Sequence, residues 1–284
     1  MTIPHAVHAF ISDHNFGEII SSNPIGGGCI NNGSRLVTAS GDTFFLKQNN
    51  NAADDMFIRE FEGLMALRVE NGPRVPEPLL HGIDFLLLED LAPARRAADY
   101  WQSFGHQLAV LHSNMNSQFG FDNDNYIGST AQENTWNDDG FLFFGQNRLG
   151  KQAELGLNNG YLNAQDKDQI ERLIDNLNQL VPEQPASLLH GDLWSGNAIS
   201  DSDGNPALID PAVHYGWAEA DLAMTDLFGG FSDSFYAAYN EVSPFESGWR
   251  ERFPIYNLYH LLNHVNLFGI SYLGQVRTIL KAFA

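Results

Sequence analysis

The first ninety residues carry short apolar runs separated by turn residues, a pattern typical of β-strands. After a helical N-terminal stretch, strands are predicted at 16–22 and 34–39, on either side of a glycine-rich turn. Further strands are predicted at 43–47, which ends in Lys47, and at 85–88, a run of one phenylalanine and three leucines. These runs predict a small antiparallel sheet.

One amphipathic helix interrupts the predicted strands, from about residue 54 to residue 70. Four side chains share one of its faces at the 3.6-residue period: Phe57, Phe61, Leu64 and Arg68. Glu60 lies at the edge of this face, whereas Glu62 points roughly the opposite way, because two positions advance the helix by about 200°. Prolines at 73, 76 and 78 end the helix.

From Tyr100 onward the apolar spacing becomes helical. It begins with a stripe of large side chains: Trp101, Phe104, Leu108 and Leu111. Further helices are predicted at 166–180, 219–228 and 254–268. The Asn- and Asp-rich run at 121–140 is interpreted as a loop-rich insertion near the functional site, where loops usually select the substrate.

The change from strand to helix patterns divides the chain into two predicted domains. Residues 1–91 form a sheet lobe with one helix, and residues 92–284 form a larger, mainly helical lobe, with the boundary close to Pro93. The fold class is therefore α+β. With 284 residues, of which 43% are hydrophobic, the chain is long enough to bury a full core.

Charge and cysteine content narrow the function classes. Thirty-five acidic residues against fifteen basic ones give a formal net charge of −20, a field that repels nucleic acid and anionic membranes. No apolar run reaches transmembrane length, and the N-terminus lacks the pattern of a signal peptide, so we expect a cytoplasmic protein. The single cysteine, Cys29, excludes an intrachain disulfide, which agrees with a reducing compartment.

The candidate chemistry is concentrated between residues 188 and 212. Asp192 and Asn197 are five positions apart, the spacing of the catalytic Asp and the metal-binding Asn in kinase catalytic loops. Asp210 follows thirteen positions later, after an apolar run. A carboxylate such as Asp192 can orient and deprotonate a hydroxyl, and oxygen ligands such as Asn197 and Asp210 suit Mg²⁺. This pattern predicts a phosphotransferase that uses ATP and Mg²⁺.

A turn-rich linker between two buried strands is the alternative interpretation of the same region. In such a linker, Asp and Asn would only hydrogen-bond the backbone. For the polar run at 201–205 this interpretation is the better one. For Asp192, Asn197 and Asp210 the spacing and the flanking apolar runs favour the site.

The predicted nucleotide site lies in the N-terminal lobe. A loop containing Gly26, Gly27 and Gly28 would let backbone N–H groups approach phosphates, although a plain glycine hairpin is the alternative. Lys47 is expected to pair with the α- and β-phosphates and to be held by Glu60. The segment from Glu89 to Leu91 is expected to act as a hinge, whose backbone groups would bind adenine.

Other polar residues are expected to have structural roles. Asp221 is interpreted either as an acid at a helix N-terminus or as an anchor for the catalytic-loop backbone. His260 and His264 are four positions apart on an apolar helix, but no third ligand with suitable spacing accompanies them, so packing is the favoured interpretation. The same holds for His112.

Together these residues carry a resemblance to a known family. The chain resembles the fructosamine/ketosamine-3-kinases, which have the protein-kinase-like two-lobe fold and are related to aminoglycoside and choline phosphotransferases. The resemblance covers nearly the whole chain and rests on seven segments: residues 26–30, 189–197, 209–212, 215–216, 219–223, 227–231 and 262–264. It implies transfer of the ATP γ-phosphate to the sugar 3-hydroxyl of a ketosamine, free or protein-bound, and hence protein deglycation.

Two residues are proposed to face that substrate. Trp194 can offer an aromatic surface to a sugar ring, and Glu219 can balance the cationic amine of a ketosamine. The alternatives are ordinary packing for Trp194 and a helix N-terminal acid for Glu219. Cys29, inside the glycine loop, is expected to be a reactive thiol and a redox switch, with a small apolar loop residue as the alternative.

Two competing functions remain open. One is a kinase for another small hydroxyl substrate, such as an aminoglycoside or an amino alcohol. The other is a pseudokinase that only binds a partner, which is disfavoured because Lys47, Asp192, Asn197 and Asp210 are all present. We expect a monomer or a weak dimer.

Overall fold

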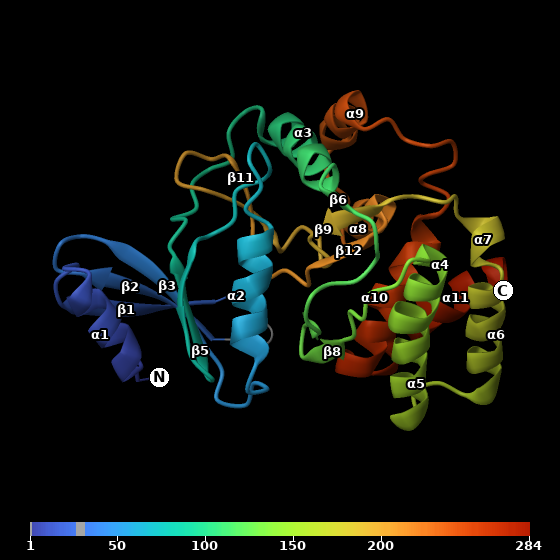
Figure 1. Ribbon diagram of the computed structural model, residues 1–284, viewed down its shortest axis with the longest axis horizontal. Helices are drawn as coiled ribbons and strands as arrows, with labels where there is room; N and C mark the ends of the chain where they lie inside the picture. Colours follow the sequence, from blue (N-terminus) through green and yellow to red (C-terminus); the bar gives the residue numbers. More distant parts are fainter. Residues whose placement is uncertain (1, 27–31) are drawn as a thin grey trace.

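A five-stranded antiparallel sheet forms the first lobe of the protein. A computed structural model describes residues 2–26 and 32–284. The strands are β1 (Ile19–Ile25), β2 (Asn32–Thr38), β3 (Thr43–Gln48), β4 (Pro78–His81) and β5 (Phe85–Glu89), in the order β1-β2-β3-β5-β4. The sheet lobe lies beside a larger helical lobe, and the two chain termini lie in different lobes (Figure 1).

Each face of this sheet is covered by one helix. Successive side chains of a strand point to opposite faces, so Leu87 packs with α1 (His5–Asp13), whereas Leu86 and Leu88 pack on the other face with α2 (Met56–Ala66). Lys47 lies on β3 opposite Leu86. The alternation in β3 and β5 therefore fixes which residues face the second lobe.

Two predicted boundaries in this lobe are wrong. The strand predicted at 16–22 begins later, because Asn15 and Gly17, with φ of 60° and 79°, form a turn after α1. The helix predicted at 54–70 is α2 and ends at Ala66. The chain then turns, with Asn71 in the left-handed region at φ 62°.

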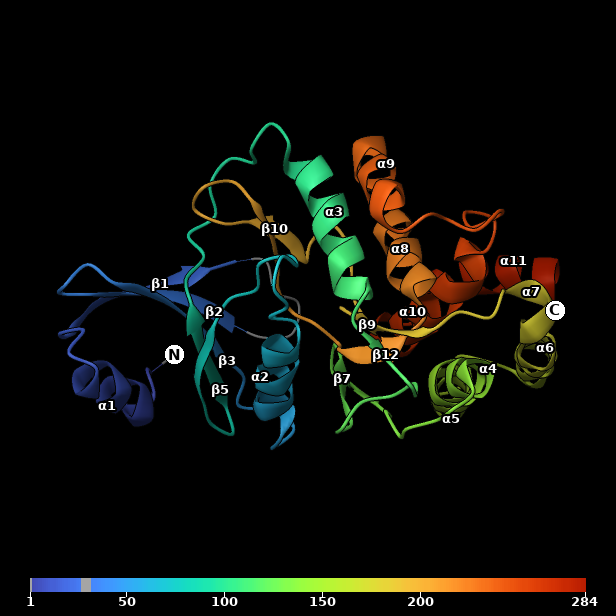
Figure 2. The same ribbon diagram turned by 45° about the horizontal axis from the view of Figure 1, so that its top comes forward.

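The second lobe is mainly helical, as predicted. Its helical segments are α3 (Tyr100–His112), α4 (Gly140–Leu142), η1 (Phe143–Gly150), α5 (Lys151–Asn158), α6 (Ala164–Asp175), α7 (Leu177–Leu180), α8 (Ala218–Leu227), α9 (Asp233–Val242), α10 (Phe253–Phe268), η2 (Ile270–Tyr272) and α11 (Leu273–Phe283). Helices α3 and α9 lie side by side (Figure 2). Within the described residues, no helix combines the length and hydrophobicity needed to span a bilayer.

Sequence patterns located two of these helices closely. The helices predicted at 219–228 and 254–268 correspond to α8 and α10, within one residue at each end. The single helix predicted at 166–180 is instead two, α6 and α7. Asn163 and Asp166 form a capping box at the start of α6, and the chain departs from helical geometry at Asn176.

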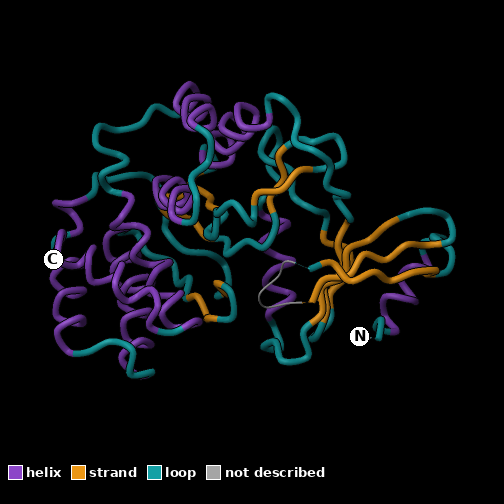
Figure 3. Tube along the Cα trace, turned by 180° about the vertical axis from the view of Figure 1, so that it is seen from behind, coloured by secondary structure: helices purple, strands orange, loops and turns teal. Residues whose placement is uncertain are grey.

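Short strand pairs lie between the helices and carry the loops of the site (Figure 3). In one three-stranded sheet, β6 (Met115–Asn116) and β12 (His214–Gly216) flank β9 (Ala186–Leu189). Two hairpins complete the set: β10 (Ala198–Ser200) with β11 (Pro206–Leu208), and β7 (Asn125–Ile127) with β8 (Thr130–Gln132). The predicted turn at 201–205 joins β10 to β11. There the Asp201 carboxylate accepts the N–H groups of Asp203 and Asn205, both at 2.9 Å.

The connection between the lobes, residues 90–99, is held against this hairpin. The Ala94 N–H donates to the Asp201 carbonyl and the Ala97 N–H to the Gly204 carbonyl, both at 3.0 Å. Gly204 has φ 86°, and a Cβ there would lie 2.5 Å from the Arg95 carbonyl oxygen, so only glycine fits. The sheet lobe, the helical lobe and this connection together confirm the predicted α+β two-lobe fold.

Candidate active site

The loop at 190–197, which we call the catalytic loop, follows β9 and is held by one buried carboxylate from α8. Asp221 accepts the N–H of His190 at 2.7 Å and the N–H of Gly191 at 2.9 Å. Burial would raise the pKa of Asp221, but its hydrogen bonds and the nearby His112 lower it. Of the two roles considered for Asp221, its contacts match the backbone anchor.

His190 ties the catalytic loop to the segment that carries Asp210. Its Nε2 lies 2.9 Å from the Ile209 carbonyl oxygen, and its own carbonyl accepts the Ala212 N–H at 2.9 Å. Gly191, with φ 82°, lies so close that a Cβ would be 2.0 Å from the Ala212 oxygen. The two segments are therefore fixed relative to each other.

Asp192 and Asn197 lie together in this loop. The Asn197 amide donates to the Asp192 carbonyl at 2.8 Å and to the Asp192 carboxylate at 3.1 Å. Burial, with smaller effects from Asp210 and Asp221, raises the pKa of Asp192 to about 7, although the Asn197 hydrogen bond opposes this rise. A carboxylate with such a pKa suits a general base at neutral pH.

Lys47 makes two ion pairs, and the one with Asp210 joins the two lobes. Its Nζ contacts Glu60 from α2 and Asp210 from the segment after β11. Burial alone would lower the pKa of Lys47, but the two carboxylates raise it, so the side chain is an ammonium. Burial raises the pKa of Glu60, and the neighbouring Asp210 adds to the rise.

Asp210 and Asn197 are the candidate cation ligands. Asp210 has φ 56°, and its side chain is 42% exposed. Asn197 directs its amide nitrogen to Asp192 and, at 3.4 Å, to the Asp210 carbonyl, which leaves the amide oxygen for a cation. Two protein oxygens fit Mg²⁺, which usually keeps waters and phosphate oxygens as its other ligands. In the described part of the chain, no cluster of three or more His, Cys, Asp or Glu could hold a metal.

The candidate nucleotide residues of the hinge and the glycine loop are only partly described. The Glu89 carboxylate contacts Arg74 and accepts the Glu77 N–H at 3.2 Å, so its side chain is engaged within the sheet lobe and with Arg74. Leu91 is buried. Gly26 is exposed. The predictions for Gly27, Gly28 and Cys29 lie outside the described residues.

Trp194 packs against a cluster of aromatic side chains. Its ring meets Phe228 edge to face at 6.2 Å between centroids, and Phe228 in turn contacts His264 at 4.8 Å and Tyr272 at 6.3 Å. A Cβ on Gly196 would lie 2.3 Å from the Trp194 ring. The glycine thus leaves room for the ring to lie over the loop, a role that the sequence analysis did not assign.

The contacts of Glu219 within the protein disfavour the substrate role predicted for it. This carboxylate is buried and accepts two hydrogen bonds from the Arg252 guanidinium, at 2.8 and 2.5 Å. It also accepts the Tyr256 hydroxyl at 3.0 Å. Its charge is therefore already balanced within the protein. A role in binding a substrate amine does not fit these contacts.

The three histidines considered as ligands lie in packed surroundings. Burial and the neighbouring His264 lower the pKa of His260 to about 3, so it is neutral. His264 hydrogen-bonds the His260 carbonyl oxygen at 2.8 Å. His112 is buried between the Tyr239 hydroxyl and the Asp221 carboxylate.

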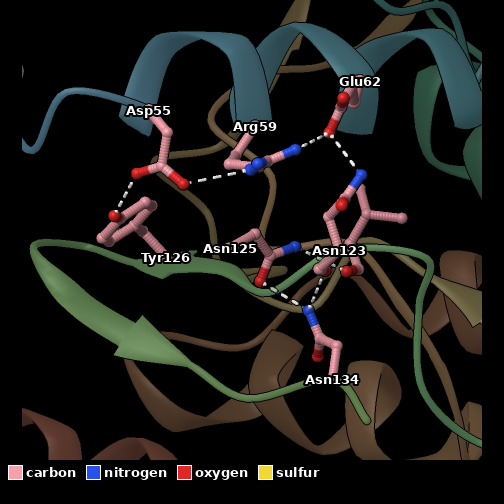
Figure 4. A network of polar contacts seen from close by, with 8 residues as sticks. Asp55, Arg59, Glu62, Asn123, Asn125, Tyr126 and Asn134 are labelled. Atoms are coloured by element: carbon pink, nitrogen blue, oxygen red, sulfur yellow. Dashed lines mark hydrogen bonds and ion pairs between the residues drawn. The ribbon is translucent and has the colours of Figure 1, made fainter. Parts of the chain in front are cut away.

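The run at 121–140 contacts α2, which the sequence analysis did not anticipate. Asn123 donates to Glu62 on α2, the helix that carries Glu60, and Tyr126 donates to Asp55, which directly precedes α2 (Figure 4). The sequence had assigned substrate selection to this run. That prediction remains untested, and only the polar character of Asn123 and Tyr126 could have indicated their contacts with α2.

The fold and this arrangement of Lys47, Asp192 and Asp210 define a phosphotransferase of the protein-kinase-like class. A family model for fructosamine kinase matches residues 5–284, and the chain belongs to the fructosamine kinase family. Macrolide and aminoglycoside phosphotransferases, at 12% and 14% identity and TM-scores of 0.61 and 0.60, share the fold.

Three proteins with higher sequence identity align with most of this chain. A Synechocystis sp. protein named "Probable ketoamine kinase" is 42% identical over 90% of this chain and 88% of its own. A chloroplastic protein-ribulosamine 3-kinase of Oryza sativa subsp. indica is 39% identical over 94% of this chain and 79% of its own. A crystal structure from Thermobifida fusca, assigned as a fructosamine-3-kinase, has 32% identity and a TM-score of 0.89 over 99% of both chains.

Proposed function

We propose that this protein transfers the γ-phosphoryl group of Mg-ATP to the sugar 3-hydroxyl of a ketosamine. The observation that carries the proposal is the joining of Lys47 to Asp210 across the lobes, with Asp192 and Asn197 in the adjoining loop. Membership of the fructosamine kinase family, together with relatives named for ketoamines and ribulosamines, supports the acceptor class.

On the donor side, each charged residue has a proposed part. Lys47 binds the α- and β-phosphates, and Glu60 holds its ammonium in place. Asn197 and Asp210 hold Mg²⁺, which when bound neutralises the phosphate charge. Residues Glu89 to Leu91 present backbone groups to adenine. The loop containing Gly26, Gly27 and Gly28 is proposed to cover the phosphates.

On the acceptor side, Asp192 orients the 3-hydroxyl and removes its proton. Its raised pKa, about 7, makes this carboxylate a stronger base, while a substantial fraction is still deprotonated at neutral pH. Trp194 presents its ring to the sugar. Phosphorylation at this position makes the adduct labile, so the reaction frees the amine, and we propose protein deglycation as the cellular role, in the cytoplasm.

An assay of ATP consumption with a panel of acceptors tests the proposal. The panel pairs fructosamine, ribulosamine and erythrulosamine adducts with an aminoglycoside and an amino alcohol, and ³¹P NMR identifies the phosphorylated position. We expect turnover with the ketosamines only, with phosphate on the 3-hydroxyl. Turnover limited to the other acceptors would reject the ketosamine assignment, and nucleotide binding without turnover on any acceptor would favour the pseudokinase.

Two variants assign that turnover to the site. Asp192→Asn serves as the inactive control, since a contaminating kinase would be unaffected by it. Trp194→Ala is expected to raise KM for the ketosamine several-fold without changing KM for ATP. An equal rise in both constants would place Trp194 outside the acceptor site.

A further inference from the structure

Residues 121–134 are the first part of the run at 121–140, and we call this part the insertion. It lies between the two elements that supply the carboxylates around Lys47. Glu60 comes from α2 in the sheet lobe, and Asp210 comes from the segment after β11 in the helical lobe. The insertion contacts both elements. Neither the family match nor the proposed chemistry assigns it a role.

On the α2 side, four contacts form a continuous polar chain (Figure 4). The Tyr126 hydroxyl donates to Asp55 at 2.5 Å, and the Arg59 guanidinium bridges Asp55 at 3.2 Å and Glu62 at 2.9 Å. The Asn123 amide then donates to Glu62 at 3.1 Å. Two residues of the insertion thus hold α2 at Asp55, just before its first turn, and at Glu62, next but one to Glu60.

On the other side, the insertion holds the backbone that follows Asp210. The Asn125 amide donates to the Val213 carbonyl at 2.7 Å, and the Gln132 amide to the Ala212 carbonyl at 3.1 Å. Gln132 also donates to the Asn125 amide oxygen at 2.7 Å. These side chains are buried, so their hydrogen bonds are shielded from competition with water.

A buried arginine fixes the insertion itself. Arg148 is 1% exposed and donates to the Asn134 amide oxygen at 2.7 Å and to the Glu133 carbonyl at 2.6 Å. The Asn134 amide donates in turn to the Asn123 carbonyl at 3.1 Å and to the Asn125 amide oxygen at 2.9 Å. The contacts to α2 and the contacts to the Asp210 segment therefore share one support.

Such a support has a physical reason in the charges around Lys47. Two carboxylates flank one ammonium, which leaves a net negative charge, so Glu60 and Asp210 repel each other. We propose that the insertion is a positioning element that holds Glu60 and Asp210 at a fixed separation around Lys47, with Asn123 and Tyr126 as its contacts to α2. The proposal rests on the proposed function of Lys47 in binding nucleotide.

The test introduces a charge into the α2 contact and then removes it. In Asn123→Asp a third carboxylate joins Asp55 and Glu62 around the single guanidinium of Arg59, which should displace α2. We expect the Kd for Mg-AMP-PNP, measured by calorimetry, and KM for ATP to rise about three- to tenfold, while KM for the ketosamine stays unchanged. Adding Glu62→Gln should restore both values, because it removes the extra charge.

Asn240→Asp is the matched control, because it adds the same charge on α9. It also keeps the Oδ1 atom, which accepts the Phe245 N–H at 2.8 Å. Hydrogen exchange should quicken in α2 in Asn123→Asp and not in the control. Tyr126→Phe should give a smaller effect of the same kind, since it removes one hydrogen bond and keeps the ring.

Three outcomes would overturn the inference. They are unchanged nucleotide affinity in Asn123→Asp, failure of Glu62→Gln to restore affinity, and losses of affinity that merely follow the melting temperature. A wild-type protein that binds no Mg-nucleotide would instead contradict the proposed function, and the positioning role would fall with it. Wild-type binding and turnover are therefore measured first.

Discussion

Asn197 donates its side-chain amide to both the backbone carbonyl and the carboxylate of Asp192, at 2.8 and 3.1 Å. The metal-ligand candidate thereby orients the candidate base, and a single residue connects the two halves of the proposed reaction. The hydrogen bond also opposes the rise in pKa that burial imposes on Asp192.

Removing the base should impair turnover and spare nucleotide binding. Asp192→Asn keeps the shape of the side chain but cannot accept a proton, so kcat should fall by about two to four orders of magnitude. The Kd for Mg-AMP-PNP should change little. Steady-state turnover and calorimetry check the two halves, and wild-type turnover in this variant would show that another group is the base.

Removing the Asp210 charge should weaken the binding of Mg²⁺. Asn tolerates the left-handed backbone that this position adopts at φ 56°, so Asp210→Asn changes the charge with little strain. The Mg²⁺ concentration for half-maximal rate should rise at least about tenfold. Asp203→Asn, in the exposed turn after β10, is the control. An unchanged Mg²⁺ dependence would place the metal elsewhere.

The pH dependence of kcat/KM should report Asp192. Its pKa in the folded protein is raised to about 7, so the carboxyl is protonated, and inactive as a base, below that pH. We expect kcat/KM to fall toward tenfold per unit as pH drops below about 7 and to be level above it. Rates measured from pH 5 to 8 check this, and a kcat/KM that stays level down to pH 5 would contradict the raised pKa.

Gly191 should not tolerate a side chain. A Cβ would lie 2.0 Å from the Ala212 oxygen, and the φ of 82° is itself strained for alanine. Gly191→Ala should lower the free energy of unfolding by about 1–3 kcal/mol or more and also displace Asp192. Gly274→Ala, where a Cβ meets nothing within 4 Å, is the control. Denaturant unfolding compares the two variants, and equal stability would show that the backbone adapts.

Glu219 should matter for stability and leave substrate affinity unchanged. Glu219→Gln unbalances the charge of Arg252, so the free energy of unfolding should fall by about 3 kcal/mol. KM for the ketosamine should match the wild type. If KM rose several-fold while the melting temperature stayed constant, the substrate role inferred from the sequence would be restored.

Local spacing accounts for what the sequence predicted well. The loop containing Asp192 and Asn197, the strand ending in Lys47 and the helix α10 depend on patterns within ten or so residues. The divided helix at 166–180 depends on a single turn residue, Asn176, whose backbone geometry a periodic pattern does not reveal.

Long-range pairing accounts for what the sequence missed. The ion pair of Glu219 with Arg252 was not predicted, because the two residues lie 33 positions apart in the chain. Glu62 was correctly placed away from the apolar face, but its contact with Asn123 spans 61 positions. The helix with π-helical geometry at η1 was not predicted, because its apolar positions follow neither the strand nor the α-helical period.

The hydrophobic core has a consequence for how the protein unfolds. One cluster joins Phe57 and Leu88 of the sheet lobe to Leu193 and Val213 of the helical lobe, whereas a second, smaller cluster lies under α1. Because the larger cluster crosses the lobe junction, heat should melt both lobes in one cooperative transition. The α1 layer has its own small core, so it is free to open first, exchanging its amide hydrogens while the rest of the protein stays folded.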